Sequence, residues 1–367
     1  MKGALWICER DIRKFTKQPF VMMSALLGPF LMLILLGNSF GGSISHIPVA
    51  VVRYSNGQYS SAFLDMVSAE DTVHLTDAPD LDSAKRLLEQ GRIKAIIYIP
   101  DGFDRGFGND NMVFITLYLD NTDPLSASTV SGYLQSSAQK LMNEMHLVSG
   151  QSTTITVDSS NYYRKVEYIE FMAPGSIIQA IFIASIIGGG VSILFDKQRG
   201  VIEGYLVTPL RQYEIIIGVL LAGVIKAMFS SLTMLFLAIT VAGVRPMTDA
   251  TGFLLMLVTI LLTGLGLISM MTAFAVRAPA PEVYQFTSFP INLVLYFTSG
   301  AIYPVEGFPD WMRDINVVNP EAYAVHALRL LMYKGADLSA VIGDFAFLAV
   351  FTVVMVSVAT IAFKRAL

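Results

Sequence analysis

The side chains most often used in catalysis and metal binding are thinly spread along this 367-residue chain. His46, His74 and His146 are far apart, and neither an H-E-x-x-H nor a G-x-S-x-G pattern occurs. Cys8 is the single cysteine, so no intrachain disulfide can form, and a catalytic thiol is disfavoured because no convincing histidine partner exists. The acidic residues therefore favour a solvated surface over a hydrolytic or metal site.

Phosphate-binding glycine loops are missing too. No segment matches G-x-x-x-x-G-K-[ST], so the chain is predicted to hold no nucleotide in a P-loop. The glycine run GGGVS at 188–192 falls at the end of an apolar segment, where glycines more often permit close helix packing. We expect a protein that is not an enzyme and has no ATPase site of its own.

The stretch FDKQRGVIEGYLVTPLRQYE, at 195–214, is the polar segment that most invites a functional interpretation. Glu203 falls in the first turn of a short predicted helix, and Pro209 lies just past its end. The apolar side of this helix consists of Val201, Ile202, Tyr205 and Leu206. It is either a plug for a groove on another protein or an ordinary amphipathic turn.

Composition places these elements in a membrane. The chain is 54% hydrophobic and 15% charged with a mean hydropathy of +0.57, whereas about 25% of residues are charged in soluble domains. Segments of roughly 18 or more apolar residues can cross a ~30 Å hydrocarbon core as helix. We expect an α-helical membrane protein with six such spans, at about 20–41, 171–195, 215–243, 252–276, 283–303 and 341–363.

Basic residues near the span ends indicate the orientation. They gather before span 1, between spans 2 and 3, between spans 4 and 5, and after span 6: Lys2, Arg10, Arg13, Lys14, Lys17, Lys197, Arg199, Arg211, Arg277, Lys364 and Arg365. By the positive-inside bias these places and both termini are cytoplasmic. The net charge of −4 is too small to indicate a partner.

Residues 1–17 are expected to form a helix in the cytoplasmic membrane interface. Leu5, Cys8, Ile12 and Phe15 recur at 3-4-3 spacing with the basic residues largely off that stripe. The alternative is a basic flank that only sets topology. A cleaved secretory signal is disfavoured because the apolar run that follows exceeds the usual signal length.

Two further segments stand between the spans. Residues 46–165 contain the strand-like runs IPVAVV, KAIIYIP and MVFITLYLD and a capped helix in DLDSAKRLLEQG, which predict a small α/β domain outside the cell. Residues 303–335, between spans 5 and 6, are too long and apolar for a turn, and prolines divide them into short helices. We expect these helices to be re-entrant in the outer leaflet.

Lys226 is the one basic residue inside a predicted span. Its stem could snorkel to the interface, or its ammonium group could face the bundle interior or a water-filled path. Asp344, early in span 6, is expected near the outer surface and so is a poor partner.

These features fit a permease driven by a separate ATPase, an ion-coupled transporter or channel, or a membrane-anchored receptor or scaffold. DKQRGVIEGYLVTPLRQYEIIIGVLL resembles the signature of ABC-2 type permeases, the membrane subunits of ABC exporters. FPINLVLYFTSGAIYPVEGFPDWMRDINVVNPEAYAVHALR resembles that family's segment after span 5, and EFMAPG is a weaker third match. The domain between spans 1 and 2 is similar to that of the subgroup with a large extracytoplasmic insertion.

The resemblance implies a division into three parts. Residues 1–45 hold the interfacial helix and span 1, 46–165 the extracytoplasmic domain, and 166–367 spans 2–6 with a coupling helix at 199–209. ATPase coupling is assigned to Arg199, Gly200, Glu203, Tyr205, Leu206, Thr208, Pro209 and Glu214. The interfacial helix presents Trp6, Arg10, Arg13 and Lys14; the candidate transport path holds Pro174, Lys226 and Phe297; and the re-entrant segment carries Pro304, Trp311, Pro320 and Tyr323.

The resemblance also implies partners. They are ABC ATPase subunits that hold ATP and Mg²⁺, a second permease copy (itself or a close paralogue), and the lipid bilayer of a prokaryotic plasma membrane. An extracytoplasmic adaptor is a further candidate, and no nucleic acid is expected. This chain itself would bind no cofactor. Its expected substrate is a hydrophobic or amphipathic drug, lipid, peptide or glycan.

Overall fold

The computed structural model describes residues 2–37, 46–69, 72–106, 113–149, 154–164, 166–201, 204 and 211–364. They form two compact units. The membrane unit comprises Met1–Ser39, Met172–Tyr303 and Asp310–Leu367, and the α/β unit comprises Phe40–Phe171 with Pro304–Pro309. Each is described by itself.

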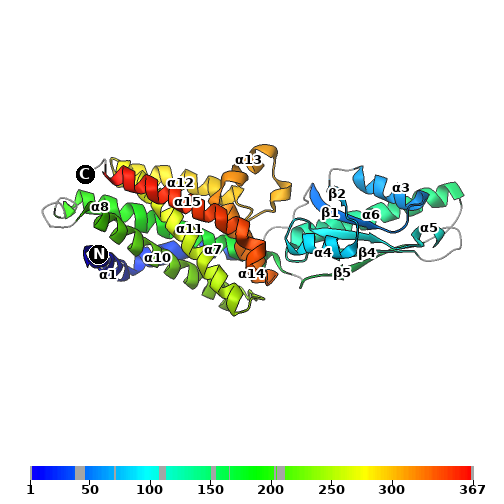
Figure 1. The fold of residues 1–367 in the computed structure, drawn as a ribbon, viewed down its shortest axis with the longest axis horizontal. Coiled ribbons are helices and arrows are strands. Elements are labelled where there is room, and N and C mark those ends of the chain that lie inside the picture. Colours follow the sequence, from blue (N-terminus) through cyan, green and yellow to red (C-terminus); the bar gives the residue numbers. More distant parts are fainter. Residues whose placement is uncertain are drawn as a thin grey trace. The chain divides into compact units, whose positions relative to one another are not determined.

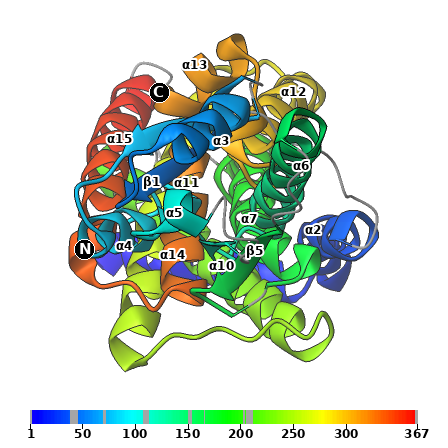
Figure 2. The same cartoon turned by 90° about the vertical axis from the view of Figure 1, so that its right-hand side faces the viewer.

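A five-stranded mixed sheet forms the centre of the α/β unit. Its strand order is β2 (Val73–Asp77), β1 (Ile47–Arg53), β3 (Ala95–Ile99), β4 (Val113–Leu119) and β5 (Ile155–Asn161), and β3 and β4 form the one antiparallel pair within this sheet. Helix α4 (Leu81–Glu89) covers one face, where Ala84 and Leu88 pack on Ala50 and Ile96. The other helices are α3 (Gln58–Ser68), α5 (Phe103–Gly106) and α6 (Pro124–Ser149), and α3 and α6 lie side by side (Figure 2).

Local sequence explains several of these boundaries. The Asp80 side chain accepts a hydrogen bond from the Ser83 amide at 2.6 Å, which caps α4, and Gly91 takes the left-handed conformation (φ 71°) just beyond the end of α4. The helix expected in DLDSAKRLLEQG is therefore α4, and the three strand-like runs are β1, β3 and β4.

A short segment from late in the chain joins the α/β unit. Pro304–Pro309 contains the short 3₁₀ helix η2 (Val305–Gly307), which contacts β1. The Lys94 ammonium lies 3.5 Å from the Glu306 carboxylate and 3.2 Å from that of Asp123. Pro304, expected in the re-entrant segment, thus packs with the α/β unit.

Every regular element described in the membrane unit is a helix (Figure 1). Its helices are α1 (Lys2–Thr16), α2 (Pro19–Gly37), α7 (Tyr168–Ser185), the π-helix η1 (Ile186–Val191), α8 (Ser192–Gln198), α10 (Gln212–Thr240), α11 (Ala250–Arg277), α12 (Pro281–Thr298), α13 (Asp310–Val318), α14 (Pro320–Tyr333) and α15 (Leu338–Lys364). Helix α11 is central, with contacts to α10, α14, α15 and η1.

Four helices within the described residues are long and apolar enough to cross a membrane: Tyr168–Gln198, Tyr213–Thr240, Ala250–Arg277 and Leu338–Phe363. They correspond to four of the six expected spans. The described apolar part of α2 is shorter, Leu26–Leu35, and α12 has 18 residues that include Glu282 and Asn292. Membrane crossing by 20–41 and 283–303 stays a prediction, as does a re-entrant course for α13 and α14.

Candidate functional site

Helix α1 packs tightly against the first half of α10. A Cβ atom at Gly218 of α10 would lie 2.7 Å from the Ala4 carbonyl oxygen and 2.8 Å from Ile7 Cβ, so only glycine allows this approach. Ala4, Ile7, Cys8 and Phe15 of α1 are buried. The expected stripe is thus only partly right: Cys8 and Phe15 face protein, but Leu5 is exposed beside Trp6, because the buried face is centred about one residue away.

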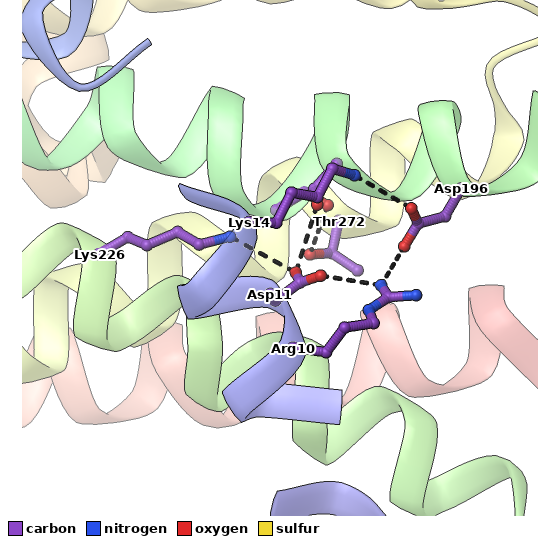
Figure 3. A network of polar contacts seen from close by, with 8 residues as sticks. Arg10, Asp11, Lys14, Asp196, Lys226 and Thr272 are labelled. Atoms are coloured by element: carbon purple, nitrogen blue, oxygen red, sulfur yellow. Dashed lines mark hydrogen bonds and ion pairs between the residues drawn. The ribbon is translucent and has the colours of Figure 1, made fainter. Parts of the chain in front are cut away.

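The same face of α1 carries a partly buried charge cluster, consisting of Arg10, Asp11, Lys14, Asp196 and Lys226 (Figure 3). The Asp11 carboxylate lies 3.4 Å from Lys226 Nζ of α10 and 2.8 Å from the Arg10 guanidinium. Asp196 of α8 pairs with Arg10 and, at 3.1 Å, with Lys14. The charge cluster therefore ties α1 to both α8 and α10.

Because these ion pairs are buried, losing one partner would cost the protein much of its stability. The side chains of Asp11 and Lys226 are only 1% and 5% exposed, and a charge left alone at such a place costs several kcal/mol. Burial by itself raises the pKa of Asp11, but Lys226, Arg10 and Lys14 outweigh it and hold that pKa below its ordinary value. Ser192 of α8 adds a hydrogen bond to the same carboxylate at 3.3 Å.

Lys226 thus turns inward and pairs with Asp11. Of the two alternatives left open by the sequence, this geometry matches the bundle interior and not snorkelling. Asp11 was missed because it sits among basic residues in a helix that was expected to face the membrane surface. The sequence did contain one indication of this site: the acidic residue Asp11 falls on the same helix face as the apolar residues Cys8 and Phe15.

The π-helix η1 lies next to the charge cluster. Cβ atoms at Gly189 and Gly190 would come within 2.9 Å of the Ile268 carbonyl oxygen and 2.0 Å of the Tyr284 ring, so the glycine run permits close packing, as expected. A π-helix replaces the regular i to i−4 bonds and often marks functional sites. Tyr284 Oη of α12 donates to the Ile186 carbonyl at 3.1 Å, and Thr272 Oγ1 of α11 donates to the Gly189 carbonyl at 3.2 Å.

The π-helix η1 also borders an apolar groove of about 620 Å³. The groove is lined by Ile186, Ile187, Val191, Glu282, Gln285, Phe286, Phe289 and Pro290. Phe286 and Phe289 of α12 are 83% and 67% exposed, so lipid or another protein must cover them. A volume of this size suits a drug-sized apolar molecule.

The predicted coupling residues are only partly visible. Glu203, Tyr205, Leu206, Thr208 and Pro209 lie outside the described residues. Helix α8 ends at Gln198, Arg199 lies over the Phe195 ring, and Gly200 takes the left-handed conformation (φ 69°). Glu214 accepts a hydrogen bond from the Arg211 amide at 3.4 Å at the start of α10. Their role in coupling stays a prediction.

The interfacial residues divide into two groups. Arg10 and Lys14 belong to the charge cluster, whereas Arg13 forms an exposed pair with Glu9 at 2.7 Å. Trp6 is exposed.

The candidate path residues do not form one site with the groove. Pro174 is buried inside α7, about 21 Å along the helix from Gly188, the neighbour of Lys226. Phe297 is exposed on α12. In the connection that follows, Trp311 is exposed, Pro320 is buried, and the Tyr323 ring stacks on Phe347 at 3.8 Å.

Comparison with known proteins identifies the architecture. A family model described as "ABC-2 family transporter protein" matches residues 19–361. The chain belongs to the ABC-2 family. Its members are membrane permeases and not the ATPases of their transporters, so this multi-pass protein is an ABC transporter permease that works with an ABC ATPase.

The chain is similar to several curated permeases along most of its length. It is 21% identical to the "Probable multidrug ABC transporter permease YbhR" of Escherichia coli over 373 aligned residues, which cover 98% of each chain. It is 22% identical to the "Inner membrane transport permease YhhJ" of the same species, over 97% of this chain and 98% of that one. The "Daunorubicin resistance ABC transporter permease protein DrrB1" of Streptomyces coeruleorubidus is 28% identical over 46% of this chain and 59% of its own.

Proposed function

We propose that this permease exports a hydrophobic or amphipathic substrate across a prokaryotic plasma membrane, as one of two permease copies driven by ATPase subunits in the cytoplasm. The observation that carries the proposal is the charge cluster. It joins α1 to α8 and α10, which are the helices on either side of the predicted coupling segment 199–209. A force applied to that segment would move these three helices together.

The π-helix then offers a route from the coupling segment to the substrate. Helix α8 continues directly from η1, and η1 is bonded to α11 through Thr272 and to α12 through Tyr284. Because η1 and α12 also line the apolar groove, a shift of α8 would change the shape of that groove. The groove has apolar walls with one carboxylate, which favours hydrophobic or amphipathic molecules over sugars.

A second permease copy is the proposed cover for the exposed side of α12. Phe286, Phe289, Leu293 and Phe297 recur at helical spacing and are exposed. Lipid alone could also cover them, but the groove beside them would then open sideways into the bilayer. Two facing copies would enclose one path between them, to which each copy would contribute Phe297, whereas Pro174 and Lys226 are buried within each copy.

The test is a charge reversal in the coupling segment. Glu203→Lys is expected to abolish ATP-dependent transport in membrane vesicles while the protein stays in the membrane at its normal level. Glu144→Lys, an exposed position on α6, is the matched control and should transport normally. A fully active Glu203→Lys variant would count against the proposal. Transport driven by an ion gradient without ATP would favour the alternative, an ion-coupled secondary transporter.

A further inference from the structure

Glu321, at the start of α14, is a fully buried carboxyl group that forms no hydrogen bond within the described residues. Its exposed fraction is 0%, and both carboxylate oxygens are buried. Buried polar groups in proteins nearly always have partners. Within the described membrane unit, this group therefore differs from the buried acids Asp11 and Asp196, which are paired with basic residues, and from Asp344, which bonds to His326.

Asn319 fixes the position of Glu321. The Asn319 side chain accepts a hydrogen bond from the Glu321 amide at 2.9 Å, which caps α14. The other end of the same amide group donates to the Leu295 carbonyl at 2.6 Å and to Thr298 Oγ1 at 3.0 Å. The first turn of α14, which includes Glu321, is thereby bound to the last turn of α12.

Within the described residues, no basic group on the helices that pack against α14 forms an ion pair with the Glu321 carboxyl group. These elements are α11, α12 and α15, and their titratable or charged groups are Asp249 (the N-cap) and Arg277 of α11, Glu282, Tyr284 and Tyr296 of α12, and Asp344 and Lys364 of α15. Arg277 is in the last turn of α11, and Glu282 is about 24 Å from Thr298 along α12.

Tyr333 lies at the opposite end of α14, about 18 Å along the helix from Glu321, and the other three titratable groups of α14 have different partners. His326 bonds to Asp344 at 2.9 Å, Arg329 donates to the Gly300 carbonyl at 2.9 Å, and Tyr323 donates to the Val317 carbonyl at 2.8 Å. The first turn of a helix favours a negative charge only modestly. An ionised carboxylate at the Glu321 site would therefore keep most of its desolvation cost, which a neutral carboxylic acid avoids.

We propose that Glu321 is a proton-binding site, protonated while α14 is packed against α12 and deprotonated when this junction opens to water. On opening, the carboxylic acid gives its proton to water and becomes a hydrated carboxylate. On closing it takes a proton back. This inference goes beyond the proposed export function, because the protonation state can be measured on the purified permease without substrate or ATPase.

Infrared spectroscopy of the full-length permease at about pH 7 tests the protonation state directly. The wild type should show the carbonyl stretch of a protonated carboxylic acid, and Glu321→Gln should remove it. Asp314→Asn, which alters an exposed carboxylate on α13, should leave the band unchanged. A spectrum that Glu321→Gln does not alter would overturn the proposal.

Thermal unfolding supplies a second measurement. If the folded state holds a proton that the unfolded state releases near neutral pH, this group lowers stability as pH rises. Glu321→Gln should therefore melt higher than the wild type, by a margin that grows from about pH 5 to about pH 8. A constant or shrinking margin would contradict a protonated Glu321.

A third measurement uses only the wild-type permease, so it does not depend on a variant that folds. A hydrophobic carbodiimide adds the O–H of a protonated carboxyl across its C=N bond, so mass spectrometry should find Glu321 modified in the wild type. The yield should fall as pH rises. Modification of Glu321 that rose with pH, or none while exposed carboxyls react, would overturn the proposal.

Discussion

Asp11 and Lys226 are the residues on which the account of the charge cluster depends. Asp11 contacts Lys226, Arg10 and Ser192. Lys226, within the described residues, forms its ion pair with Asp11 alone. The two side chains are therefore not equivalent. Loss of Lys226 leaves Asp11 with Arg10, but loss of Asp11 leaves a buried ammonium group uncompensated.

We therefore predict that Asp11→Asn destabilises the permease more than Lys226→Met. Stranding a buried charge costs about 3–5 kcal/mol, and the double variant should lose less than the sum of the two. Thermal unfolding of the purified permease measures the order. Glu9→Gln, which breaks an exposed pair on the same helix, should change little. A larger loss for Lys226→Met would mean that Asp11 does not neutralise Lys226.

Asp104 gives a pH-dependent prediction for the α/β unit. Its carboxylate accepts hydrogen bonds from the Ser55 hydroxyl at 2.5 Å and from the amides of Gly57, Tyr59 and Ser60 at 2.8–3.0 Å. Burial raises the pKa of Asp104, but these hydrogen bonds outweigh it and lower the pKa to about 2. This stabilisation is present above the ordinary value near 4 and is lost as pH falls toward about 2.

The start of α3 should therefore open in acid before the sheet does. Pulsed hydrogen exchange after brief exposure to acid should label the amides of Tyr59 and Ser60 ahead of those in β1. Asp104→Asn should show the same labelling at neutral pH. Equal protection of both segments at all pH values would mean that Asp104 does not hold α3.

At the scale of elements, η1 is the feature on which the coupling route depends. A methyl group at Gly190 would overlap the Tyr284 ring, so Gly190→Ala should push α12 away and weaken the hydrogen bond to Ile186. We predict reduced stability and reduced transport. Gly343→Ala is the matched control: it lies in α15 with open space at its Cβ, and should be neutral or stabilising by about 0.5–1 kcal/mol. A Gly190→Ala variant with normal stability and transport would show that the packing of η1 on α12 is not needed for coupling.

Sequence patterns predict some of these elements and not others. Four spans were predictable because long apolar runs need no tertiary information, and α4 because Asp80 and Gly91 mark its ends. The π-helix was not, since its extra residue per turn depends on partners from α11 and α12. Nor was the packing of Pro304–Pro309 on the α/β unit, which depends on contacts across some two hundred residues of chain, such as Lys94 with Glu306.

At the scale of the whole molecule, the topology is a prediction that labelling can test. In a Cys8→Ser background, a cysteine at Ser83 should react with a membrane-impermeant thiol reagent on cells with an opened outer barrier. A cysteine at Thr208 should not, because that segment is predicted to face the cytoplasm. The opposite pattern would invert the permease and separate the charge cluster from any cytoplasmic ATPase.

The central claim is that this permease moves its substrate only with an ATPase that it does not itself contain. The most direct measurement is transport of a fluorescent amphipathic dye in proteoliposomes that contain the purified permease, with and without its co-purified ATPase chain. We expect dye movement that requires both the ATPase chain and ATP, and that is lost in Glu203→Lys. Dye movement by the permease alone, driven by an ion gradient and indifferent to ATP, would contradict it.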